Sequence, residues 1–169
     1  MSGRLWYPQL DVYDAIRRMA GLLLFCDPAS LPSRERLYIA DFYFANPPLL
    51  HTTHMTSEVR RQFNALGVPR PEKTFISYPS APLLFQKMEE VQRQAFRTLV
   101  GKGLIDVQSL ERGIVKPSDA GTALLDEHFA SLFNEEERRI GKFIANSFLR
   151  GGEQIDGLRR STGLRRVGR

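Results

Sequence analysis

Residues 103–121 read GLIDVQSLERGIVKPSDAG, and this stretch decides which fold the chain is expected to adopt. Two short apolar runs, 104–107 and 114–115, flank a polar turn that ends in Gly113, as in a hairpin with its glycine at the bend. Ser118 then stands where it can cap a following helix. With a long amphipathic helix predicted just before it, the stretch is typical of the wing of a winged helix. Winged helices serve both as DNA readers and as protein-docking modules.

Most of the remaining chain has the apolar spacing of helices. Asp11, Ser33 and Asn134 are good helix caps, and Asn46-Pro47-Pro48 ends the second helix because proline removes a helical donor. Residues 68–80, with three prolines, read as a connection with room for one edge strand. The expected fold is mostly α with a small β-hairpin, a winged-helix-like domain with additional helices over residues 7–150. The predicted helices cover residues 11–25, 33–46, 57–66, 82–101, 118–133 and 134–149.

The positive charge of the chain is concentrated at its C-terminal end. The formal net charge is +5, and residues 150–169 hold six arginines against two carboxylates, a net of +4. Gly151-Gly152 marks the start of this segment, so residues 151–169 are predicted to form a flexible basic tail. Four of its arginines, Arg159, Arg160, Arg165 and Arg166, come in two pairs six residues apart, a spacing that does not hold all four on one narrow helical face. Such a tail is either simply solvated or becomes ordered on a polyanion or an acidic partner surface.

Few side chains suggest chemistry. His51 and His54 stand three residues apart with His128 far along the chain, and a polar capping loop is favoured over a metal site because no acidic or cysteine partner has ligand spacing. Asp41 lies within an apolar helix, which favours a buried ion pair or an interface contact over a catalytic acid. The single cysteine, Cys26, is read as a small buried apolar residue. We therefore expect no enzyme activity, no metal, no cofactor and no small-molecule substrate.

The predicted helix before the wing has a poor surface for reading DNA. It offers Lys87, Arg93 and Arg97, but also Glu89 and Glu90, which would repel phosphate. Protein docking is therefore favoured over sequence-specific reading of the major groove. The chain also has no apolar stretch long enough to cross a membrane and no signal-peptide core, so a cytoplasmic location is expected.

Three stretches give the chain a family resemblance. LDVYDAIR at 10–17, RLYIADFYFANPPLL at 36–50 and PSDAG at 117–121 resemble the middle components of the ABC-three-component systems, which include the Lamassu-type bacterial defence operons. The resemblance implies a small non-catalytic subunit associated with an SMC-like ABC ATPase and an effector, often a nuclease, in defence against phage or plasmids. It has no motif of catalytic residues to carry over.

The leading hypothesis is an adaptor subunit of an ATPase-driven defence complex. The alternative is a winged-helix transcription regulator that binds DNA, and a third is a basic accessory protein that binds DNA through its tail. The second helix has more aromatic surface than a core of this size needs, which predicts partner binding by Asp41, Phe42, Tyr43, Phe44, Leu49 and Leu50. The predicted nucleic-acid contacts are Arg93, Arg97, Arg159, Arg160, Arg165 and Arg166.

Overall fold

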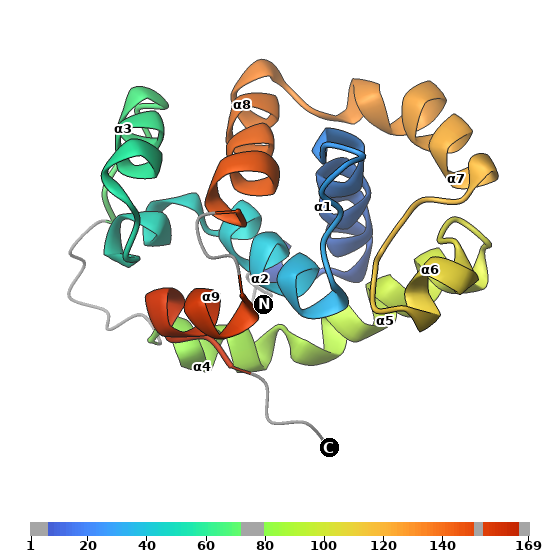
Figure 1. The fold of residues 1–169 in the computed structure, drawn as a ribbon, viewed down its shortest axis with the longest axis horizontal. Coiled ribbons are helices and arrows are strands. Elements are labelled where there is room, and N and C mark those ends of the chain that lie inside the picture. The colour runs from blue at the N-terminus through green and yellow to red at the C-terminus, as the bar shows by residue number, and fades with distance from the viewer. Residues whose placement is uncertain (1–6, 72–79, 151–153, 166–169) are drawn as a thin grey trace, which may run out of the picture.

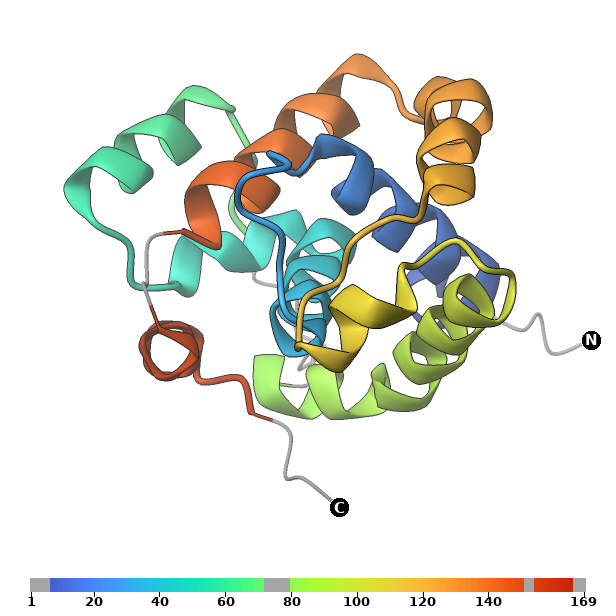
Figure 2. The same ribbon diagram turned by 45° about the vertical axis from the view of Figure 1, so that its right-hand side comes forward.

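A computed structural model describes residues 7–71, 80–150 and 154–165 (Figure 1). Helix α1 (Val12–Phe25) lies at the centre of the molecule and packs against α2 (Arg34–Ala45), α5 (Glu89–Gly101) and α8 (Glu135–Phe143) (Figures 1 and 2). Helix α3 (Ser57–Ala65) stands to one side. The chain is therefore mostly helical, as predicted.

The helix starts follow the predicted caps. The Asp11 carboxylate accepts hydrogen bonds from the backbone N–H groups of Tyr13 and Asp14 at 2.8 and 3.1 Å. The Ser33 hydroxyl caps α2, and Asn134 forms a reciprocal capping box with Glu137 at the start of α8. Each cap satisfies backbone donors that the first helical turn leaves unpaired.

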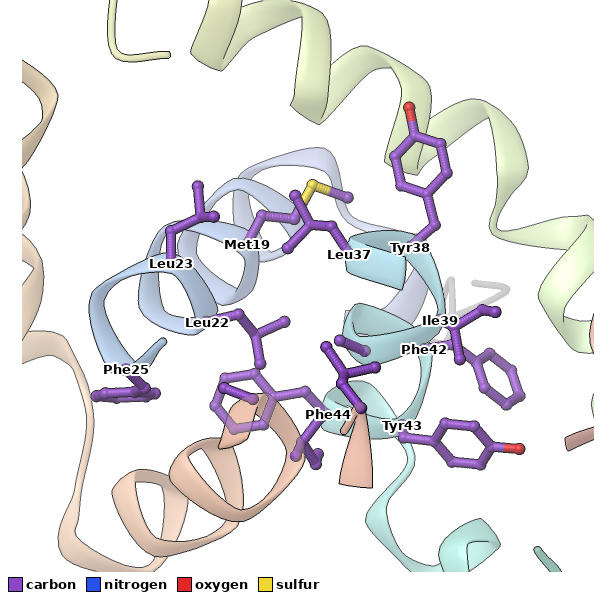
Figure 3. Close-up of a cluster of buried hydrophobic side chains, with 14 of the residues drawn as sticks. Met19, Leu22, Leu23, Phe25, Leu37, Tyr38, Ile39, Phe42, Tyr43 and Phe44 are labelled. Atoms are coloured by element: carbon purple, nitrogen blue, oxygen red, sulfur yellow. The ribbon is translucent and has the colours of Figure 1, made fainter. Parts of the chain in front are cut away.

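Helix α2 is buried along most of its length. All eight residues from Leu37 to Phe44 are shielded from solvent. Figure 3 shows Leu37 and Phe44 on the side of α2 that faces Met19 and Leu22 of α1. Tyr38, Phe42 and Tyr43 point away from α1 and are buried on the other sides of the helix. The predicted burial of this helix on several sides is confirmed. Cys26, just after α1, is also buried, and burial raises the pKa of its thiol to about 12. The thiol is therefore protonated at neutral pH and behaves as the expected small apolar residue.

Several predicted helices are interrupted. The helix expected over 82–101 breaks at Met88 into α4 (Ala81–Lys87) and α5. The helix expected over 118–133 consists of α7 (Asp119–Leu124), the π-helical turn η3 (Leu125–Phe129) and the 3₁₀ turn η4 (Ala130–Leu132). Helix α8 continues into a second π-helical turn, η5 (Ile144–Phe148). Short 3₁₀ turns, η1 (Pro8–Leu10) and η2 (Pro47–Thr52), precede α1 and follow α2.

The predicted wing is wrong. Residues Val107–Glu111 form the short helix α6, because the Asp106 carboxylate accepts from the Ser109 N–H and hydroxyl at 3.1 and 2.5 Å and so caps a helix. Among the described residues, the only strand-like pairing is the isolated bridge between Ile105 and Pro117. Neither a hairpin nor a winged helix is supported. The alternative of a winged-helix regulator therefore loses its structural basis.

The predicted flexibility of the C-terminal segment is also wrong over the part that the structure describes. Residues Ile155–Thr162 form helix α9, which lies beside α4 at the lower edge of the molecule in Figure 1. Leu158 and Leu164 are buried, with 2% and 0% of their surface exposed, so this segment is packed. The proposed division at residue 150 stays a prediction, because residues 151–153 lie outside the described ranges.

Two further expectations concern the edge strand and membrane-spanning helices. The edge strand expected within 68–80 falls largely on residues 72–79, which lie outside the described residues. In the described part of the chain, every helix is too short or too polar to cross a bilayer.

Candidate functional site

Asp41 is the most deeply buried charged group among the described residues, with none of its surface exposed. Arg18 of α1 donates from Nε to Oδ1 of Asp41 at 2.7 Å and from Nη2 to Oδ2 at 3.3 Å. Gln92 of α5 donates to Oδ2 of Asp41 at 2.8 Å and to the Tyr38 carbonyl at 2.9 Å. The carboxylate is thus enclosed by donors from two neighbouring helices, which ties α1, α2 and α5 together.

Arg18 has a second acidic partner. It forms an ion pair with Asp14 one turn earlier on α1, and its Nη1 also donates to the Pro8 carbonyl at 3.3 Å. Burial alone would lower the pKa of Arg18, but the carboxylates of Asp41 and Asp14 outweigh it and hold the pKa above its usual value. The guanidinium therefore stays charged. Of the two roles that the sequence favoured for Asp41, a buried ion pair or a contact with a partner, the structure shows the ion pair. Asp41 has no exposed surface for a partner, and the network offers no open position to a substrate.

The other predicted partner-binding residues are placed in the core. Phe42, Tyr43 and Phe44 are buried (Figure 3). Leu50 is also buried, and Leu49 is half-buried against the same cluster. Phe42 packs edge-on against Phe85 of α4 at a ring distance of 5.6 Å. In this conformation, these side chains fill the interior of their own chain and leave a partner almost no surface to contact.

The histidines are separated by the fold. His51 Nε2 lies 2.7 Å from the Val68 carbonyl, and its ring packs edge-on against Phe63 at 4.8 Å. His54 and His128 are exposed. Residues 7–71, 80–150 and 154–165 contain no group of three side chains suited to hold a metal ion. His51 thus lies within the 3₁₀ turn η2 and contacts α3 and the segment after it, rather than standing in a loop.

The predicted nucleic-acid contacts on α5 differ in how much charge they offer. Arg93 donates to Glu89 at 2.6 Å and lies 3.8 Å from Glu90, so its charge is largely compensated. Arg97 is exposed and has no ion pair within the described residues. This helix therefore presents little net positive charge, as its sequence indicated.

The arginines of the C-terminal segment are brought together. Arg159, Arg160 and Arg165, with Asp156, line a surface hollow of about 280 Å³. Arg159 is engaged by Glu35 of α2, whereas Arg160 and Arg165 are exposed. Arg166 lies outside the described residues. Glu35 is the functional candidate that sequence reasoning missed, since its contact with Arg159 joins residues more than 120 positions apart and no local pattern signals it.

Comparison with known proteins identifies one relationship. Residues 4–167 match the family described as ABC-three component (ABC-3C) system Middle Component 5. No curated protein and no solved structure matches the chain.

Proposed function

This chain belongs to the Middle Component 5 family of ABC-three-component systems, and we propose that it is a non-catalytic adaptor between the two other components of such a system. The proposed partners are an SMC-like ABC ATPase and an effector of the nuclease class. The proposed setting is cytoplasmic defence against phage or plasmids, in a system of the Lamassu type. The observation that carries this proposal is the extent of the family match, which spans nearly the whole chain rather than one segment of it.

The proposed contact with a partner uses a surface other than the second helix. Tyr13 is 80% exposed on α1, and Leu132 is 50% exposed at the end of η4. Arg17 lies one turn after Tyr13 on the same face of α1, and its Nη1 donates to the Leu132 carbonyl at 3.3 Å. Exposed aromatic and aliphatic side chains beside an arginine are the composition found at the centre of protein interfaces. We therefore assign the ATPase contact to Tyr13 and Leu132, which Arg17 links.

Co-purification tests this assignment. Co-expressed with the ABC ATPase component of its system, the tagged chain is expected to recover the ATPase as a stable complex. The double substitution Tyr13→Ser and Leu132→Ser removes the apolar anchors and is expected to reduce recovery by about tenfold or more, because truncation of a few central residues dominates interface energies.

The matched control is Ile114→Ser, which removes a similarly exposed side chain from the turn after α6. This variant is expected to recover the ATPase like the wild type. Thermal unfolding of each variant shows whether the fold is intact. Recovery of free chain alone from the wild-type co-expression would contradict the adaptor proposal, while equal recovery with both variants would contradict only the assigned surface.

A second part of the proposal concerns DNA. Since Arg93 and Arg159 are engaged by carboxylates, we assign the contact with DNA phosphates mainly to Arg160 and Arg165 on the C-terminal segment, with Arg97 as a further exposed cation. Such contacts position a complex on DNA without reading its sequence. This role complements the adaptor function, because it would hold the assembled system on the nucleic acid.

A further inference from the structure

The C-terminal segment repeats the text Gly-Leu-Arg-Arg at residues 157–160 and 163–166. In the structure, the leucines of both repeats, Leu158 and Leu164, point into the body and are almost completely buried. The backbone of α9 is also tied to the body, because the His54 N–H donates to the Ser161 carbonyl at 3.1 Å. In each repeat, a buried leucine therefore anchors the segment to the body, and the next residue is an arginine.

An ion pair with α2 fixes the orientation of α9. Arg159 donates from Nε to Oε1 of Glu35 at 2.8 Å and from Nη2 to Oε2 at 2.7 Å, the parallel two-bond geometry of an arginine on a carboxylate. Its remaining Nη1 donates to Asp156 at 2.8 Å. These carboxylates raise the pKa of Arg159, mainly through the hydrogen bonds to Glu35. Arg159 is thus fully occupied in holding the helix and is not available to a ligand.

A left-handed turn at Gly163 brings the second repeat back to the first. Gly163 has φ of +71°, which residues with a Cβ rarely adopt, and it ends α9. The chain then reverses so that Arg165 lines the same hollow as Arg160. Both side chains are exposed, and no ion pair holds either of them within the described part of the chain.

From this geometry we propose that Arg160 and Arg165 form a preorganised site for a DNA phosphodiester, and that Glu35, Arg159 and Gly163 act as its positioning residues. The inference rests on the proposed DNA contact and specifies how it is made. Two arginines that line one hollow from an anchored backbone lose less conformational freedom on binding than the same arginines on a flexible arm. The consequence is unusual for an anion site: the carboxylate of Glu35 strengthens phosphate binding, because it holds α9 in place.

Removing the charge of Glu35 tests this consequence. If Glu35 positions α9, DNA affinity falls, whereas if only net charge matters, DNA affinity stays the same or rises. The probe is a fluorescently labelled DNA duplex of about 30 base pairs of arbitrary sequence, titrated with the full chain between about 50 and 200 mM salt. Arg160→Ala and Arg165→Ala are each expected to weaken binding several-fold and to lower the salt slope by about one unit. Glu35→Gln is expected to weaken binding by about 3- to 10-fold with the salt slope unchanged, since the two phosphate-contacting groups remain but are no longer positioned.

The matched control is Glu111→Gln, which removes the same charge from the exposed end of α6. It is expected to leave DNA affinity unchanged or slightly increased. Gly163→Ala changes no charge, strains the left-handed turn and is expected to weaken binding as Glu35→Gln does. Circular dichroism and thermal unfolding confirm that the body of each variant stays folded.

Each outcome bears on a distinct claim. If Glu35→Gln binds DNA as tightly as Glu111→Gln or more tightly, simple charge governs the interaction and the positioning role is wrong. If Arg160→Ala and Arg165→Ala bind like the wild type, or if the wild-type chain does not bind the duplex at the lowest salt, the site itself is wrong. None of these results affects the adaptor proposal, which co-purification tests separately.

Discussion

Replacing Arg18 by alanine is expected to lower the free energy of unfolding by about 3–5 kcal/mol, because it leaves a buried carboxylate without its cation. Asp41 has no exposed surface, and Arg18 supplies two of the hydrogen bonds that hold it. After the substitution Gln92 still donates to Asp41 but carries no charge. The measurement is equilibrium urea unfolding of the full chain, followed by circular dichroism.

Arg61→Ala is the matched control for this prediction. Arg61 pairs with Glu58 on α3, but both side chains are largely exposed, so the loss of this pair is expected to cost at most a few tenths of a kcal/mol. A loss of stability in Arg18→Ala no larger than in Arg61→Ala would show that the buried network does not hold α1, α2 and α5 together. Replacing Arg18 by methionine and Asp41 by leucine together is expected to recover much of the loss, since apolar groups of similar volume can substitute for a buried ion pair.

Replacing Phe133 by alanine is expected to cost about 3–5 kcal/mol, since it removes a large ring from a filled core. The Phe133 ring meets Phe25 edge-on at 5.4 Å and lies nearly parallel to Phe44 at 6.0 Å. It also occupies the space above Gly21, where a Cβ would stand only 2.3 Å from the ring. The Phe133 ring can approach α1 this closely because Gly21 has no Cβ.

The control for Phe133→Ala is Leu132→Ala, one residue earlier and half exposed, with an expected loss below about 1 kcal/mol. A double-mutant comparison of Gly21→Ala and Phe133→Ala, also measured by urea unfolding, tests the same packing. Gly21→Ala alone is expected to destabilise the fold, but when combined with Phe133→Ala its methyl group enters the vacated space, so the double variant is expected to lose less than the sum of the two. Strict additivity would contradict the proposed packing of the ring on α1.

The elements predicted from the sequence are those with local signals. The caps at Asp11, Ser33 and Asn134 and the apolar spacing behind them predicted the bounds of α1 and α2 closely, and the start of α8. The predicted end of the last helix matches the end of η5 rather than that of α8. These signals are reliable because a cap and the face of one helix depend on residues only a few positions apart. The need of Asp41 for a cationic partner was also predictable from its apolar surroundings, although the identity of that partner was not.

The errors arose where contacts distant in sequence decide the structure. Residues 103–121 contain both a hairpin pattern and a cap at Asp106. The capped helix forms, and Val115 donates its N–H to the distant Pro32 carbonyl instead of joining a hairpin ladder. The basic C-terminal segment was read as flexible because Glu35, which holds Arg159, lies far away in the sequence. The same apolar sequence suits a helix in a core and a helix in an interface. The sequence of α2 therefore could not distinguish burial by its own chain from burial by a partner.

An adaptor connects two other components, and the most direct test of this role is to omit the chain. The ABC ATPase and the effector of the same system are purified separately, mixed with and without the chain, and examined by size-exclusion chromatography with mass determination. The adaptor account predicts one complex containing all three proteins when the chain is present, and separate ATPase and effector when it is absent. An ATPase–effector complex that forms equally well without the chain, or a chain that binds neither component, would contradict the account.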